Sequence, residues 1–461
     1  MTSSREVRKG ASITLVSNIF EKIIVFGNVF LILSYLSVYE YGVVELVFSA
    51  VSLVGIVMLP GIGSTIQADI SVARAKGEKG EMRALFLQYA LFQLGVGVLA
   101  FLCMYFGAAF IAGYSGNASI QLFLQVVSFS FLLSPLRTLS LLIATVFARF
   151  FDQSLYPMVE EVAKTLGLVI GFFFLHLGPL GLLYAVLFSQ AMAVLFFLPR
   201  TISGYMYFAH SYSHTHVTLH FWKIFEAHRR WSVLSGYIGM LTQNLQLWVI
   251  KLLLGTEAVG LYAFATGIMS NLSSLLPFTD VFTSLGPRYI EKKKEFIGLI
   301  QNSIRLQGIM AVLLVTVGIT GLPFLTFFIP KYKPALFLSM LMLVVILPTA
   351  TTAVFTPTFA ILKQQVEYFK TMLIKFLLTA LIMPLSILGF GIYGIAIGSI
   401  LINSVSGFER YFRLRRLLPE LVLKLRSLFV ITRNDLQTVR QYANKVFSRE
   451  ALTKLLISKD S

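Results

Sequence analysis

Five cationic side chains lie inside stretches of the sequence that are otherwise apolar. A charged side chain within hydrocarbon costs about 2.5 to 3.5 kcal/mol on insertion scales, so each one is a candidate for function. Lysine and arginine bind phosphate groups through charge-assisted hydrogen bonds. We therefore predict an anionic ligand, held by some or all of Lys22, Arg137, Lys164, Lys251 and Lys375.

Acidic and amide side chains in the same stretches indicate further roles. Glu21 and Asp280 are the candidates for binding a proton or Na⁺ that drives transport, although a counter-ion role beside Lys22 explains them equally well. Gln243 and Asn244 predict hydrogen bonds to sugar-like hydroxyl groups, or alternatively hydrogen bonds that join helices.

Ion pairing is the main structural alternative for these charges. Glu160 or Glu161 can reach Lys164 at three or four residues' spacing on one helix face. Arg137 and Lys251 have no acid at that spacing, so a functional role and a distant structural partner stay equal alternatives for them. The charge of Glu45 is interpreted as lying near a membrane interface, where exposure costs little.

Helix-breaking residues recur at related positions. Pro60 and Gly61 are matched by Pro277, and Pro135 is matched by Pro348, since 348 − 135 = 213. Interrupted helices at corresponding positions of two halves flank transport sites or form hinges, and a tolerated kink is the alternative.

Other chemistry has little support in the sequence. His210, His214, His216 and His220 stand close together, but no carboxylate lies among them, so we predict a solvated loop and no metal. The single Cys103 excludes an intramolecular disulfide. The net charge of +17 is interpreted as basic loops that face anionic lipid, so no nucleic acid is expected.

The elements that carry these residues are predicted to cross a membrane. The chain is 57% hydrophobic and 13% charged, whereas a soluble domain is about a quarter charged. Continuous apolar runs must form helices because backbone groups in lipid pair only within the segment. Twelve spans are predicted, near residues 11–35, 42–68, 85–112, 120–147, 157–177, 181–199, 231–254, 259–284, 306–329, 336–361, 369–388 and 392–409.

Landmarks of the first half recur in the second. Gly42 matches Gly260 (260 − 42 = 218), and Gly178 matches Gly391 (391 − 178 = 213). A repeat of six spans keeps its orientation, so we expect an all-α polytopic protein of two six-helix bundles related by a pseudo-two-fold axis along the membrane normal. Lys and Arg collect in alternate loops, which predicts that both termini are cytoplasmic.

The predicted domains follow from this repeat. Residues 1–200 form the first bundle, 201–230 a cytoplasmic linker, 231–411 the second bundle and 412–461 a cytoplasmic amphipathic tail. Basic residues interleave with Leu and Phe in this tail, so an interfacial helix is expected whose basic side chains face lipid headgroups: Arg413, Arg415, Arg416, Lys424 and Arg426.

The stretch LSYLSVYEYGVVELVFSAVSLVGIVMLPGIGSTIQADISVARAKGE resembles the Wzx-type polysaccharide flippases of the multidrug/oligosaccharidyl-lipid/polysaccharide exporter superfamily. Tyr41-Gly42, the glycines Gly61 and Gly63, and the basic loop 74–83 carry the resemblance, and LWVIKLLLGTEAVGLYAFA resembles the start of the family's second half.

This resemblance implies two bundles that open alternately to either side of a bacterial inner membrane. The implied cargo is an undecaprenyl-diphosphate-linked oligosaccharide for O-antigen, lipopolysaccharide, capsule or exopolysaccharide, with a polysaccharide polymerase complex left open as a partner. Lys22 and Lys251 would face the central cavity. The alternatives are a cation-coupled multidrug exporter and, with less support, a membrane enzyme acting on lipid-linked sugars; the short external gaps argue against catalysis.

Overall fold

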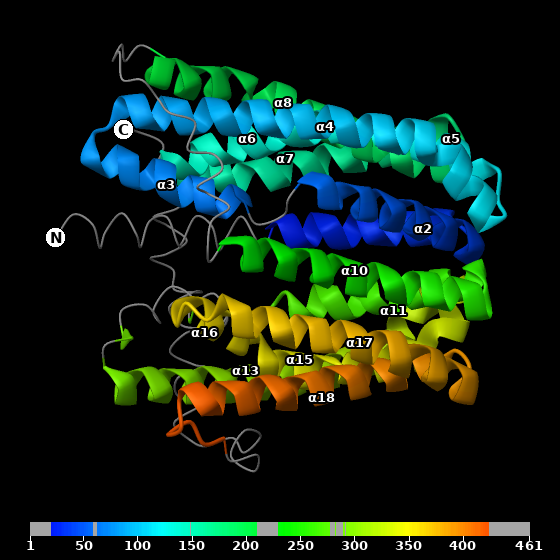
Figure 1. Cartoon of the computed structure of the whole chain (residues 1–461). Helices are drawn as coiled ribbons and strands as arrows, with labels where there is room; N and C mark the ends of the chain where they lie inside the picture. Colours follow the sequence, from blue (N-terminus) through cyan, green and yellow to red (C-terminus); the bar gives the residue numbers. More distant parts are fainter. Residues whose placement is uncertain are drawn as a thin grey trace, which may run out of the picture. The chain divides into compact units, whose positions relative to one another are not determined.

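The computed structural model describes residues 20–58, 62–147, 149–209, 229–276, 282, 289–290 and 292–423, and within these residues the regular structure is entirely helical (Figure 1). A helix over residues 20–35 comes first. The first half continues with α2 Val38–Gly55, α3 Ile62–Lys76, α4 Lys79–Ser115, α5 Ser119–Ser128, α6 Ser130–Val146, α7 Phe150–Val169 and α8 Pro179–Ala209. The second half contains α10 Arg229–Leu254, α11 Thr256–Ser273, α13 Lys293–Phe328, α14 Leu336–Val344, α15 Ile346–Ala353, α16 Phe355–Ile361, α17 Gln365–Phe390 and α18 Tyr393–Leu417.

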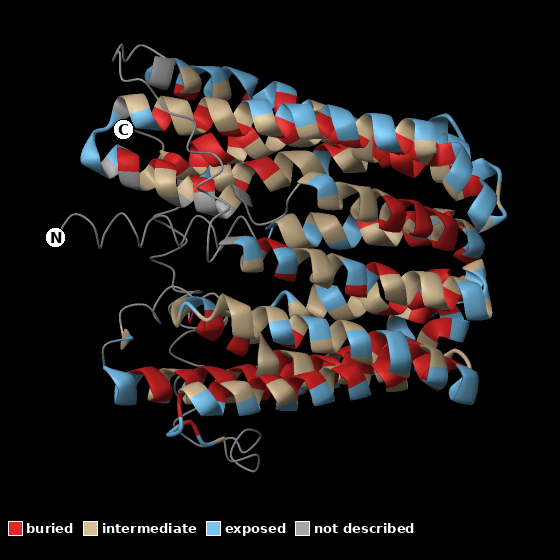
Figure 2. Ribbon diagram, in the orientation of Figure 1, coloured by how far each residue is buried: buried red, intermediate tan, exposed pale blue. Residues whose placement is uncertain are grey.

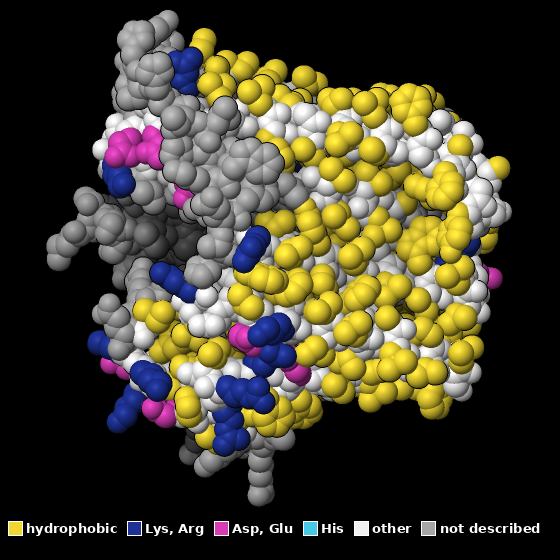
Figure 3. Space-filling model, in the orientation of Figure 1, with side chains coloured by type: hydrophobic (Ala, Val, Ile, Leu, Met, Phe, Trp, Pro, Cys, Tyr) yellow, Lys and Arg dark blue, Asp and Glu magenta, His cyan; other side chains and the backbone are white. Residues whose placement is uncertain are grey.

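The described part of each predicted span therefore coincides with a helix or with consecutive helices. Seven helical segments of the described chain are long and apolar enough to cross a membrane by length and composition. Large apolar side chains on α4 face outward, as in Phe106 at 73% and Phe110 at 81% exposure. Exposed and half-buried apolar surface is widespread (Figures 2 and 3), as expected of a protein whose solvent is lipid.

The predicted repeat is visible in the helices themselves. Helices α2 and α11 each have 18 residues, and they begin at Val38 and Thr256, where 256 − 38 = 218. The turns before α8 and α18 also match, because Gly178 and Gly391 both have positive φ angles, of 56° and 58°. The sequence landmarks thus mark the same local structure in both halves.

These two glycines lead to a stability prediction. A side chain at a left-handed position costs roughly 1 to 2 kcal/mol, so Gly178→Ala and Gly391→Ala should each lower the thermal stability of the purified protein. Gly389→Ala is the control, because its backbone φ is not positive and no atom lies within 4 Å of the added carbon. Equal melting temperatures for Gly389→Ala and the two test variants would contradict the prediction.

The fourth span of each repeat is interrupted. Helix α5 ends before Phe129 and α6 contains Pro135, while α14 ends before Val345 and α15 contains Pro348. The two breaks are related by 345 − 129 = 216. A proline removes a backbone donor and clashes with the preceding turn, so both breaks have a local cause. Pro60, Gly61 and Pro277 lie outside the described residues.

The helices form two compact units, which we describe separately. Among the described residues, the first unit holds 20–36 and 50–209, and the second holds 37–49 and 229–423. The beginning of α2 thus packs in the second unit. There Gly42 lies against the backbone of Thr256 and Gly260, and Gly260 lies against the backbone of Val38, so α2 and α11 touch at equivalent positions of the repeat.

The end of the second half differs from the predicted interfacial tail. Helix α18 continues to Leu417, past the predicted end at residue 409, and Arg413 pairs with Glu367 at 2.5 Å and with Glu409, so it does not face headgroups. Arg415 and Arg416 are exposed, and Lys424 and Arg426 lie outside the described residues.

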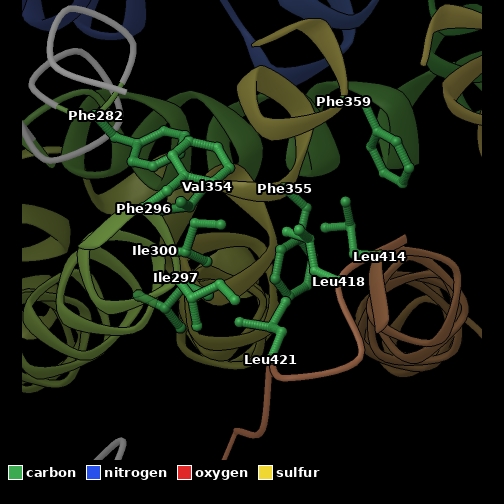
Figure 4. Close-up of a cluster of buried hydrophobic side chains, with 11 residues drawn as sticks. Phe282, Phe296, Ile297, Ile300, Val354, Phe355, Phe359, Leu414, Leu418 and Leu421 are labelled. Atoms are coloured by element: carbon green, nitrogen blue, oxygen red, sulfur yellow. The ribbon is translucent and has the colours of Figure 1, made fainter. Parts of the chain in front are cut away.

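A buried apolar cluster explains this longer helix (Figure 4). Leu414, Leu418 and Leu421 are at most 5% exposed, and they pack against residues of α13, α15–α16 and the segment before α13. These three leucines of the predicted interfacial tail are therefore core residues. Figure 3 shows Lys and Arg side chains gathered at the lower left of the view, where α18 lies in Figure 1.

Candidate functional site

A buried polar network lies in the first unit. Asn28, on the helix over 20–35, is 1% exposed and donates to the carboxylate of Glu161 on α7 at 2.8 Å. Thr165, one turn further along α7, donates to the amide oxygen of Asn28 at 2.7 Å. Because both polar ends of the amide are satisfied, this network joins the two helices without an unpaired buried group.

The network leads to a second stability prediction. Asn28→Ala removes a buried donor from Glu161 and should cost about 1 to 3 kcal/mol, measured as a lower melting temperature in detergent. Asn117→Ala, near the turn before α5 where Asn117 accepts a hydrogen bond from the nearby backbone of Ser119, is the control. A melting temperature of Asn28→Ala equal to wild type would show that the network adds nothing.

Two of the predicted cations of the first unit, Arg137 and Lys164, form ion pairs with acids. Arg137 on α6 contacts Glu160 at 3.0 Å, and Lys164 contacts Glu161 at 3.7 Å. The distant structural partner left open for Arg137 is thus present. Glu21 interacts electrostatically with Lys22, Glu161 and Glu160, so this unit brings acids and bases together in one cluster.

The second unit holds a different arrangement, centred on Lys375. Its ammonium donates to the side-chain oxygen of Asn403 at 2.9 Å, across the contact between α17 and α18. Asn403 in turn donates to the carbonyl of Ser399. Lys375 lies ten residues into α17, which is about 15 Å at 1.5 Å per residue, and therefore near the middle of a membrane-crossing helix.

Arg410 lies two turns from Asn403 on α18 and is 8% exposed. Its guanidinium contacts the sulfur of Met372 at 3.2 Å and lies 5.8 Å from the centre of the Tyr368 ring. Its Nε–H is buried and has no hydrogen-bond partner. Arg410 and Lys375 also repel each other electrostatically.

The neighbouring acids form their ion pairs with other bases, and Glu409 also attracts Arg410 electrostatically. Glu409 pairs with Arg413, and Glu367 pairs with both Arg413 and Lys370. Lys375 and Arg410 are thus held by a neutral amide, a thioether and an aromatic ring. A buried charge normally has an opposite charge beside it, so this pair, which we call the second-unit cation pair, has the chemistry of an anion-binding site.

The remaining predicted residues within the described chain lie on α10 and on the helix over residues 20–35. Lys251 occupies the last turn of α10, where a cation complements the helix dipole. Asn244 is buried and accepts from Ser49 of α2 at 2.6 Å, so it joins helices, whereas Gln243 is exposed. Lys22 is half-buried, and Asp280 and the loop histidines lie outside the described residues.

Sequence reasoning missed Arg410 and Asn403. Arg410 was hidden because the sequence placed the end of the last span at residue 409 and treated the basic residues beyond it as headgroup contacts. A helical spacing of seven residues between Asn403 and Arg410 was the available signal, since it places both on one face. Within the described ranges, no three His, Cys, Asp or Glu side chains gather as a metal site would require.

Comparison with known proteins agrees with the fold and with the sequence pattern. Residues 7–282 match the family model described as polysaccharide biosynthesis protein. No protein of curated function matches the chain in sequence.

Solved transporter structures share the fold. An inward-facing multidrug resistance MATE family transporter of the MOP superfamily has a TM-score of 0.71 at 13% identity, covering 88% of this chain and 95% of its own. A MATE transporter of Vibrio cholerae has a TM-score of 0.65 at 15% identity, covering 91% and 99% respectively. An outward-facing MATE transporter has a TM-score of 0.65 at 12% identity, covering 90% and 96%.

These matches agree with the resemblance of the sequence to the Wzx-type flippases. The helices, the repeat and the family match together describe a multi-pass membrane protein with the two-lobe fold of MOP-superfamily transporters. The chain belongs to the polysaccharide biosynthesis protein family.

Proposed function

We propose that this protein is a flippase that moves an undecaprenyl-diphosphate-linked oligosaccharide across the bacterial inner membrane by alternating access. The second-unit cation pair is the observation that carries the proposal. A diphosphate that crosses hydrocarbon needs cationic groups to replace its water. Lys375 and Arg410 supply two such charges, and neither has a carboxylate as its hydrogen-bond partner among the contacts described above.

The structure of the site suits a transient ligand. Each cation is held in place by a neutral group, so a diphosphate does not have to displace an acid from it. Arg410 has a buried N–H available for a phosphate oxygen, and Tyr368 and Asn403 lie beside the pair with further polar atoms. In this proposal both termini are cytoplasmic, the chain is not an enzyme, and the cargo serves O-antigen, capsule or exopolysaccharide assembly.

Export of cationic drugs is the second candidate, because two of the solved structures with this fold are multidrug resistance transporters. The acids Glu21, Glu160 and Glu161 of the first unit would then bind the cargo. The ion pairs of Glu160 and Glu161 favour the flippase, since a cationic drug would have to displace Arg137 or Lys164.

Binding separates these candidates directly. Undecaprenyl diphosphate should bind the purified protein and undecaprenol should not, as measured by native mass spectrometry. Arg410→Gln should weaken diphosphate binding at least tenfold, about 1.4 kcal/mol. Equal binding of the diphosphate and the alcohol, or unchanged binding by Arg410→Gln, would remove the pair from the site.

A further inference from the structure

Glu45 is an acid that the proposed flippase mechanism leaves without a role. It is the eighth residue of α2, about 10 Å from the start of the helix at 1.5 Å per residue, and its neighbours VYEYGVVELVFSAV are mostly apolar. A carboxylate at this position is costly unless the structure has a use for it.

Three tyrosines interact with the carboxylate of Glu45. Tyr41, one turn earlier on α2, makes a side-chain hydrogen bond with Glu45. The hydroxyls of Tyr262 on α11 and Tyr332, in the short helical segment Pro330–Ala335, interact with it electrostatically. The rings of Tyr41 and Tyr332 meet edge to face with centres 6.4 Å apart. All of these residues belong to the second unit.

The hydroxyl groups differ in how they are satisfied. Tyr262 donates to the side-chain oxygen of Gln246 at 2.9 Å, which leaves the lone pairs of its own oxygen available. Tyr332 is 0% exposed, and its hydroxyl has no hydrogen-bond partner. A buried hydroxyl without a partner is costly, and such exceptions require an explanation such as an absent ion or water. This hydroxyl and the carboxylate together therefore indicate a small ligand between them.

We propose that Glu45 binds a monovalent cation, either a proton or Na⁺, with Tyr332 and Tyr41 supplying neighbouring oxygens. Carboxylate and hydroxyl oxygens suit such a hard cation, and its charge neutralises the acid. The other charged groups near this cluster are Glu40 and Lys331, which interact with each other, and Glu40 also interacts with Tyr332.

The position of the site links occupancy to helix packing. Gly42 lies between Tyr41 and Glu45 on α2 and makes the close backbone contact with Thr256 and Gly260 of α11. Tyr262 of the cluster lies on the same helix, two residues after Gly260. Binding of a cation at Glu45 therefore acts on the contact between the second helices of the two repeats.

Infrared difference spectroscopy tests the site in the full-length protein in nanodiscs, without any cargo. One arm changes the pH from 8 to 5 in K⁺, and the other exchanges K⁺ for Na⁺ at pH 8. A carboxyl band in the first arm identifies a proton, and a shifted carboxylate band in the second identifies Na⁺. The band from an apolar environment should be absent in Glu45→Gln and retained in Glu40→Gln, which removes the acid five residues nearer the start of α2.

Tyr332→Phe is the second variant, because it removes the unpartnered hydroxyl and keeps the charge. For Tyr332→Phe, the midpoint of the infrared band's titration should shift by about one pH unit in the first arm, or by about tenfold in Na⁺ concentration in the second. Spectra of Glu45→Gln that match wild type in both arms would overturn the proposal. If Glu45→Gln does not fold, an unchanged midpoint in Tyr332→Phe would overturn it. Because no lipid-linked sugar is used, this result is independent of the proposed flippase function.

Discussion

The Lys375→Met variant is expected to transport at least tenfold more slowly than wild type and to have a higher melting temperature. Methionine fills a similar volume without the charge, so the variant removes the electrostatic repulsion with Arg410 and the cost of burying an ammonium. The same change removes one of the two charges available to a diphosphate. A residue that is present for function alone should show this opposite movement of activity and stability.

Lys370→Met is the matched control. Lys370 lies five residues earlier on α17 and pairs with Glu367, with its side chain 49% exposed. An exposed pair contributes about 0 to 1 kcal/mol, so we expect transport within twofold of wild type. Transport can be measured as redistribution of a fluorescent lipid-linked sugar in proteoliposomes, and stability as a melting temperature. A Lys375→Met protein with full transport, or with a clearly lower melting temperature, would contradict the assignment.

Gly42→Ala and Gly260→Ala are each expected to reduce transport at least tenfold. A Cβ atom on Gly42 would overlap the carbonyl oxygen of Thr256, and one on Gly260 would overlap the carbonyl oxygen of Val38. Both obstacles are backbone atoms, which cannot rotate away as a side chain can. Small residues permit such close helix contacts in membranes, so α2 and α11 would have to separate.

Gly107→Ala tests whether this effect is specific. Gly107 lies in α4 and has no atom within 4 Å of an added Cβ, so alanine there should leave transport and expression unchanged. Full transport by Gly42→Ala would show that the contact is not required at any stage of the cycle. A loss in all three variants would indicate a general intolerance of larger residues.

The architecture could be predicted because its causes are local. Apolar runs, the turn glycines and the basic loops each act over a few residues, and the match between Gly178 and Gly391 in sequence became a match in backbone conformation. Pro135 and Pro348 lie inside α6 and α15, soon after the breaks at Phe129 and Val345, and proline disturbs only the turn before it.

The site could be predicted only in part because its contacts are distant in sequence. Arg137 pairs with Glu160, which is 23 residues away, and Lys375 binds Asn403, which is 28 residues away. Helix periodicity reveals pairs three or four residues apart, so it found Lys164 with Glu161 and missed the others. The tyrosines around Glu45 come from three separate elements, which is why its charge was interpreted as an interfacial one.

The two units differ in how they handle charge. In the first, Glu160 and Glu161 pair with Arg137 and Lys164 and the network extends to Asn28. In the second, Arg410 is buried and Lys375 is half-buried, and the nearby acids form their ion pairs with Arg413 and Lys370, while Glu409 also attracts Arg410 electrostatically. Helices of the two halves of the repeat thus carry different polar groups, and we propose anion binding for the second unit alone.

The most direct test of the flippase function is redistribution of a fluorescent undecaprenyl-diphosphate oligosaccharide in proteoliposomes, followed by its protection from an external quencher. We expect wild-type protein to move the lipid between leaflets, Lys375→Met and Arg410→Gln to move it at least tenfold more slowly, and undecaprenol carrying the same dye to give no protein-dependent signal. Absence of redistribution with wild-type protein, together with efflux of a cationic drug under an ion gradient, would contradict the account and assign the protein to drug export.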